Sequence, residues 1–143
     1  MRSLSVLVSL GLALVLVPPA TPVLAADMAK LTVAKECSEY AGTVPSFCTI
    51  TESSLPAITA GMKVLYYGPV TNNPAFSSNN VVLDDGAGST AMGNCIVDFG
   101  AGPKGICAFY AGSGALAGFM AIVQVSVDDK SVWHWDGSYS LAK

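Results

Sequence analysis

A histidine and an aspartate stand two residues apart in the stretch WHWDGSYSL, which runs from Trp133 to Leu141. In an extended strand, residues two apart point to the same face, so His134 and Asp136 can come within hydrogen-bond reach. A hydrolytic site would also need a nucleophile such as Ser126 or Ser138, and no motif in the chain places a serine beside the pair. We therefore expect a solvated polar strand face here and assign no catalytic residue.

A glycine-rich stretch, AGSGALAG, covers residues 111–118 and resembles the glycine pattern of a nucleotide-binding loop. Such a loop needs a helix directly after it, because the helix N-terminus holds the phosphates. The residues that follow, FMAIVQVSV, are rich in β-branched side chains and alternate in polarity, which predicts a strand. We therefore expect Gly112 and Gly114 to serve a turn, and we expect no nucleotide or other cofactor.

Four cysteines are the remaining candidates for chemistry: Cys37, Cys48, Cys95 and Cys107. No CxxC pair occurs, although zinc sites usually contain one. The segment IVDFGAGPKGI predicts a hairpin centred on Ala101, which places Cys95 opposite Cys107 at a distance that a disulfide spans. The second disulfide then joins Cys37 to Cys48. The acidic stretch DDGAG, at 84–88, lacks the ligand spacing of a calcium loop, so we expect no metal site.

The N-terminal segment indicates the compartment. Arg2 precedes an apolar run from Leu4 to Val17, and prolines and small residues follow in PPATPVLAA. This is the pattern of a secretory signal peptide, and the run is shorter than the ~20 residues of a membrane-spanning helix. We predict a signal peptide over residues 1–26 and one exported domain over residues 27–143, extracellular or periplasmic and without membrane contact after cleavage.

The mature chain is acidic and has the length of one domain. The full chain carries a net charge of −3, and removal of Arg2 with the leader makes the charge about −4. Nucleic acids and anionic membranes attract basic protein surfaces, so we expect neither as a partner. A small apolar molecule is the partner that we expect, and the sequence leaves the oligomeric state open.

The elements that must position these residues are short strands. Runs of Val, Ile, Thr, Tyr and Phe alternate with clusters of Gly, Pro, Asn and Asp, and a helical period is missing. We predict an all-β, calycin-like fold, an eight-stranded antiparallel β-barrel. The predicted strands are residues 30–37, 47–51, 62–67, 80–83, 94–99, 105–110, 116–127 and 131–141. The longest irregular segment, 68–80, is a candidate border of a binding site.

The last hairpin defines a candidate binding face. A three-residue turn at 128–130 pairs Val125 with Trp133 and Val123 with Trp135. Side chains on one face of this hairpin are aromatic or aliphatic, and a water-soluble barrel points its apolar face inward. The lumen candidates are Phe119, Val123, Val125, Trp133, Trp135 and Tyr139. They either fill a solid core or line a cavity for one small ligand, because eight strands allow both.

The C-terminal part of the chain also resembles a known family. The stretch AGSGALAGFMA, from Ala111 to Ala121, is followed by one strand and then by WHWDGSYSL. This order is similar to the closing part of the allene oxide cyclase and dirigent barrels, and most of all to their small exported bacterial members. The resemblance implies an eight-stranded barrel whose lumen holds apolar molecules and, in the plant enzymes, directs a reactive lipid or phenolic intermediate. Leu116 and Ala117 replace the aromatic and acidic residues expected there, so no catalytic residue carries over.

Three functions follow from these observations. The first is a small-molecule-binding barrel without chemistry, which is favoured because the apolar face is present and reactive groups are missing. The second is a cyclase or isomerase that acts on a reactive lipid-like or polyketide-like intermediate, since such an enzyme needs little beyond shape and one or two polar groups. The third is a structural or interaction barrel with a solid core.

Overall fold

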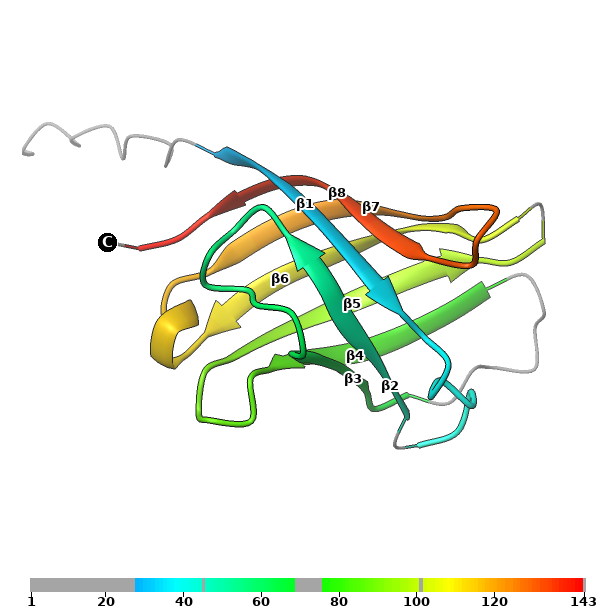
Figure 1. Cartoon of the computed structure of the whole chain (residues 1–143), viewed down its shortest axis with the longest axis horizontal. Coiled ribbons are helices and arrows are strands. Elements are labelled where there is room, and N and C mark those ends of the chain that lie inside the picture. Colours follow the sequence, from blue (N-terminus) through cyan, green and yellow to red (C-terminus); the bar gives the residue numbers. More distant parts are fainter. Residues whose placement is uncertain (1–27, 45, 69–75, 101, 143) are drawn as a thin grey trace, which may run out of the picture.

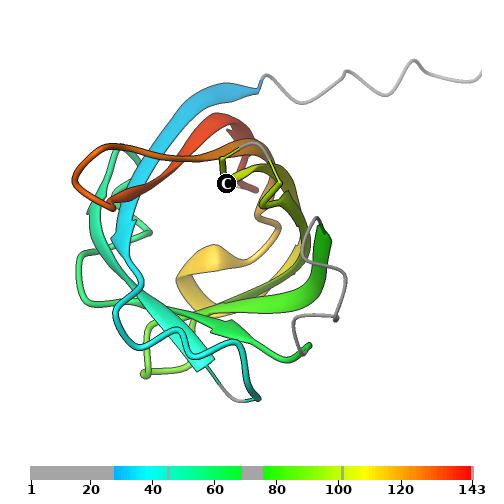
Figure 2. The ribbon, with the colours of Figure 1, turned by 90° about the vertical axis from the view of Figure 1, so that its right-hand side faces the viewer.

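The chain folds into a closed barrel of eight antiparallel strands, each hydrogen-bonded to the next and the last to the first, as the computed structural model in Figures 1 and 2 shows. The structure describes residues 28–44, 46–68, 76–100 and 102–142. The predicted fold class is thereby confirmed. The strands are β1 (Ala29–Glu36), β2 (Ser46–Ser53), β3 (Lys63–Tyr66), β4 (Phe76–Asp84), β5 (Thr90–Asp98), β6 (Lys104–Gly112), β7 (Met120–Val127) and β8 (Trp133–Ser140).

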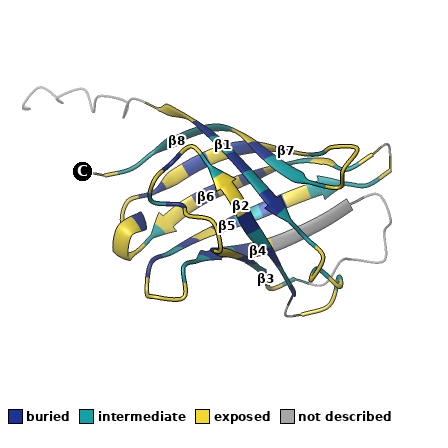
Figure 3. Cartoon of the chain, in the orientation of Figure 1, coloured by how far each residue is buried: buried dark blue, intermediate teal, exposed yellow. Residues whose placement is uncertain are grey.

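Alternation along the strands separates the core from the outer surface. In β7, the side chains of Ala121, Val123 and Val125 are buried, and those between them face solvent or are only partly covered. The same period of two appears as alternating colours along β1 in Figure 3. Successive side chains of a strand point to opposite faces of the sheet, so the apolar set of every strand meets inside the barrel.

One end of the barrel is closed by packed loops. Between β6 and β7 the chain forms a short 3-10 helix, η1 (Gly114–Leu116), whose Leu116 side chain is fully buried. The loop between β2 and β3 lies at the same end and buries Leu55 and Ile58. In Figure 2, which looks into the barrel from the other end, η1 lies at the back of the ring. The predicted strand 116–127 was therefore too long, because residues 116–119 turn the corner and only the part from Met120 onward pairs.

The predicted irregular segment 68–80 was also too long. Residues from Phe76 onward belong to β4 and pair with β5, with Phe76 opposite Asp98. Residues 69–75 lie outside the described part of the chain, as does the predicted signal peptide. Within the described ranges, no helix has the length and apolar character needed to cross a membrane.

The last hairpin has a longer turn than the predicted three residues. The backbone N–H of Asp128 donates to the carbonyl of Val132, and Ser131 adopts a positive φ of 63°. The Asp128 carboxylate accepts hydrogen bonds from the N–H groups of Lys130 and Val132, which holds the longer loop. Val125 consequently pairs with Trp135, and the predicted register was wrong. The shift equals one full period of two, so every side chain keeps the predicted face.

Candidate ligand cavity at one end of the barrel

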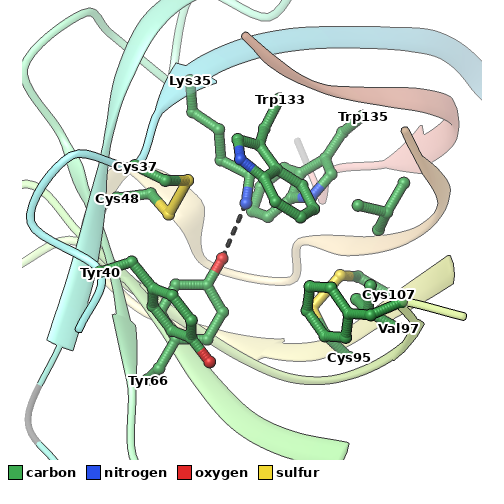
Figure 4. A pocket seen from close by; sticks show the side chains of 12 residues that line it. Lys35, Cys37, Tyr40, Cys48, Tyr66, Cys95, Val97, Cys107, Trp133 and Trp135 are labelled. Atoms are coloured by element: carbon green, nitrogen blue, oxygen red, sulfur yellow. Dashed lines mark hydrogen bonds between the residues drawn. A yellow bond between two sulfur atoms is a disulfide. The ribbon is translucent and has the colours of Figure 1, made fainter. Parts of the chain in front are cut away.

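A cavity of about 40 Å³ lies inside the barrel at the end opposite η1 and is partly open to solvent. Five aromatic side chains line it, and Figure 4 shows how four of them surround the space: Tyr40, Tyr66, Trp133 and Trp135. Phe99 is the fifth. Two valines, both disulfides and one lysine complete the lining. The cavity therefore combines an apolar wall with very few polar groups.

The lysine in this wall is Lys35, near the end of β1. It continues the alternation of Leu31 and Val33, so its side chain points into the lumen, and only 2% of its surface is exposed. Its Nζ donates a hydrogen bond of 2.7 Å to the hydroxyl oxygen of Tyr66 on β3, drawn as a dashed line in Figure 4. Lysine is among the residues least often buried in proteins, and it is usually paired when it is.

Aromatic rings surround the Lys35 amine. Its Nζ lies 4.8 Å from the ring centroid of Trp135, 5.5 Å from that of Tyr66 and 5.6 Å from that of Trp133. Within the described ranges, neither Asp nor Glu lines the cavity. The amine is thus held by ring faces and one hydroxyl instead of a carboxylate.

Burial changes the ionisation of both partners in this hydrogen bond. Loss of hydration disfavours the charged amine and lowers the pKa of Lys35 from 10.5 to about 7. Burial also raises the pKa of the Tyr66 phenol, and nearby Tyr40 raises it further. At neutral pH the pair therefore contains a protonated phenol and an amine for which both the charged and the neutral forms are populated.

Both disulfides belong to the wall of the cavity. Cys37 is bonded to Cys48 and Cys95 to Cys107, with Cα–Cα distances of 4.2 and 4.1 Å, and both predicted pairs are confirmed. Cys95 and Cys107 stand directly opposite each other in the β5–β6 hairpin, as its predicted register required. The two bridges tie neighbouring segments together on either side of the cavity, so they stiffen the end of the barrel where the cavity lies.

Half of the predicted lumen residues line this cavity. Val125, Trp133 and Trp135 do so. Phe119 and Val123 are fully buried elsewhere in the core, and Tyr139 is half-buried with its ring 6.2 Å from that of Phe119. These positions establish which side chains face inward, and contact with a ligand stays a prediction for all six.

Sequence reasoning missed Lys35 and Tyr66. The signal was present, because Lys35 follows two buried apolar residues at spacing two, and Tyr66 follows Val64 in the same way. A charged residue at a core position of a strand is a mark of function or of a specific partner. The partner could not be read from the chain, since the two residues are 31 positions apart.

The other sequence candidates lie away from the cavity. His134 is on the outer face of β8, where its Nε2 lies 3.0 Å from Asp128 Oδ2, so the turn aspartate and not Asp136 is its partner. Gly114 has a positive φ of 58° and begins η1, and β7 follows, so the strand predicted after the glycine-rich stretch is confirmed. In the described part of the chain no group of three His, Cys, Asp or Glu side chains is arranged to hold a metal ion.

Comparisons of the chain with protein-family models, with curated proteins and with solved structures found no match. The resemblance to allene oxide cyclase and dirigent barrels therefore stays a prediction. What can be argued about function depends on the cavity and on the side chains that line it.

Proposed function

We propose that this protein is an exported barrel that binds one small apolar molecule in the cavity at the end of its lumen. The observation that carries the proposal is a cavity lined by aromatic rings at one end of the barrel. Protein interiors normally pack without voids larger than a water molecule, so a lined cavity of this kind favours an occupant. Two disulfides in one small domain, together with the predicted signal peptide, support export.

The size of the cavity limits the ligand. One water molecule needs roughly 10–15 Å³ of such space, and the cavity offers about 40 Å³. This volume suits a compact ligand, or one end of a longer ligand whose remainder lies in the partly open mouth. Val97 and Phe99 are half-buried members of the wall and would contact that remainder.

Tryptophan emission provides a direct test, because the chain has two tryptophans and both line the cavity. Titration of the oxidised mature protein with hexan-1-ol should shift or quench the emission and should saturate. Val97→Phe, which places a larger side chain in the wall, should weaken this binding at least tenfold. Ile96→Phe is the matched control, since Ile96 is the neighbouring residue on the outer face and is 46% exposed.

Two results would oppose the proposal. If neither hexan-1-ol nor an environment-sensitive apolar dye perturbs the emission, the cavity does not bind apolar molecules. A partner would then have to bind the outer surface of the barrel. If both phenylalanine variants weaken binding equally, the ligand does not occupy the cavity.

A second candidate function is that of a cyclase or isomerase acting on a reactive lipid-like or polyketide-like intermediate. The observation that favours it is the Lys35–Tyr66 pair, which puts a proton donor and a proton acceptor side by side in an apolar space. The resemblance to the allene oxide cyclase and dirigent barrels supports the same candidate. Turnover of an unsaturated fatty epoxide, lost in Lys35→Met and retained in Lys63→Met, would distinguish this enzyme from a binding protein.

A further inference from the structure

We propose that Lys35 is a nucleophilic amine that captures an apolar aldehyde or ketone in the cavity as a Schiff base. The inference rests on the proposed function, because the carbonyl compound must enter the same cavity. Lys35 lines that space, its side chain is fixed by burial and by one hydrogen bond to Tyr66, and aromatic rings enclose its Nζ. Lysines buried in apolar surroundings are the ones that form Schiff bases in enzymes.

The surroundings of the amine favour its neutral, nucleophilic form. The titratable side chains that face it in the cavity wall are Tyr40 and Tyr66, and burial raises the pKa of the Tyr66 phenol, which keeps that phenol neutral at pH 7. The loss of hydration on burial lowers the pKa of Lys35 to about 7. Near neutral pH the free amine is then a major form of Lys35, whereas it makes up roughly one molecule in three thousand at pH 7 for a lysine with a pKa of 10.5.

Two residues that line the cavity, Trp135 and Tyr66, carry hydrogen-bond donors. The indole N–H of Trp135 is buried, and within the described residues it has no partner. The Tyr66 phenol keeps its proton because its pKa is raised, and its oxygen lies 2.7 Å from Lys35 Nζ. A carbonyl oxygen that enters this space would accept from these donors, which would make the attached carbon more electrophilic.

The proposed reaction conserves atoms and charge. The lone pair of Lys35 Nζ forms a bond to the carbonyl carbon, the C–O π bond breaks, and the oxygen takes a proton through Tyr66 while nitrogen loses one, which gives a carbinolamine. The carbinolamine then loses its hydroxyl group together with the second nitrogen proton as water, and a C=N bond forms. Tyr66 ends protonated as it began, and the two hydrogens of the amine leave in the water molecule. Apolar side chains surround the amine, which limits the access of water that would hydrolyse the Schiff base.

The test uses hexanal with sodium cyanoborohydride, which converts a Schiff base into a stable hexyl-lysine. The oxidised mature protein is treated at pH 7 and digested, and the modification at each lysine is measured by mass spectrometry. We expect Lys35 to be modified at least ten times faster than the exposed Lys30, Lys63, Lys104 and Lys130 of the same molecule. The ratio of Lys35 to Lys63 modification should fall as the pH rises from 7 to 10, because the exposed amines then become neutral as well.

Two tyrosine variants test the role assigned to the phenol. Tyr66→Phe keeps the ring and removes the hydroxyl that lies beside the amine, so modification of Lys35 should slow roughly tenfold. Tyr67→Phe is the matched control, because the neighbouring Tyr67 side chain is 53% exposed and outside the cavity wall. If Tyr66→Phe fails to fold, the Schiff-base proposal is still tested by the relative modification rates of the lysines in the unaltered protein.

Hexan-1-ol separates the two proposals, because it has the same chain but no carbonyl group. If hexan-1-ol perturbs tryptophan emission and Lys35 is modified no faster than Lys63, the Schiff base is wrong and the binding function stands. If neither compound perturbs the emission and Lys35 stays unmodified, both proposals are wrong. Preferential modification of Lys35 that hexan-1-ol slows by competition would support both.

Discussion

Replacement of Lys35 by methionine should make the barrel more stable at pH 6, and this gain should shrink as the pH rises. Methionine has nearly the length of lysine and no charge, so it can fill the same space in the core. In the parent protein the buried amine is charged at pH 6, without a carboxylate in the cavity wall. Folding at that pH therefore includes the cost of moving an ammonium group out of water, which the variant avoids.

The size of the effect follows from the pKa of Lys35. In the unfolded chain this pKa has its ordinary value of 10.5, and folding lowers it to about 7. Between these values the unfolded state binds more protons than the folded state, so the free energy of unfolding of the parent protein rises with pH. The slope approaches about 1.4 kcal/mol per pH unit above pH 7, and the total gain from pH 6 to pH 9 is about 3 kcal/mol. In Lys35→Met the free energy of unfolding lacks this pH-dependent contribution.

Urea unfolding followed by tryptophan emission measures this difference at pH 6, 7, 8 and 9. Other titrating groups are common to both proteins and cancel in the comparison. All four cysteines are paired, so no free thiol promotes disulfide exchange at high pH. Lys63→Met is the control, because Lys63 is exposed and lies with its Nζ 4.3 Å from the ring centroid of Phe47 on the outer face.

A constant difference between the parent protein and Lys35→Met from pH 6 to pH 9 would refute the reasoning. It would mean that the amine titrates at its ordinary pKa, and hence that it reaches water or an anionic partner in the folded protein. Lys35 would then be almost entirely protonated at neutral pH, which would contradict its proposed role as a nucleophile.

Three further predictions concern the turn before β7, the disulfide between β5 and β6, and the tryptophans of β8. Gly114→Val should lower the free energy of unfolding by about one to a few kcal/mol, because φ at this position is +58° and a Cβ would lie 2.7 Å from the Ser89 hydroxyl oxygen. A melting temperature equal to that of the parent protein would contradict this prediction. Joint replacement of Cys95 and Cys107 by alanine should cost about 2–4 kcal/mol in chemical unfolding. Peptide mapping of the parent protein without reduction should link Cys95 to Cys107 and Cys37 to Cys48, and any other pairing would contradict the structure. Because Trp135 is 1% exposed and Trp133 is half-buried, the emission of the oxidised protein should be blue-shifted and iodide should quench it only in part. Red-shifted and fully quenched emission would mean that water reaches this face of the hairpin.

Local patterns in the chain were enough to predict the class of fold and the direction of its side chains. Alternation with period two depends only on strand geometry, so the inward set of β7 could be identified without knowing which strands pair. For the same reason the predicted inward and outward faces of the last hairpin are correct although its predicted register is wrong. Val125 pairs with Trp135, two residues beyond the predicted partner. The disulfide in the β5–β6 hairpin was predictable because a tight turn sets the register of the strands beside it.

The sequence by itself therefore determined a disulfide-bonded, eight-stranded barrel with an aromatic inner face. Tertiary structure decided whether space remained inside, because the volume left in a core depends on how side chains from seven strands and their loops fit together. It also decided the chemistry of that space. Lys35 on β1 meets Tyr66 on β3 and two tryptophans on β8 only when the barrel closes, and the loss of hydration that lowers the pKa of Lys35 exists only in that enclosed state.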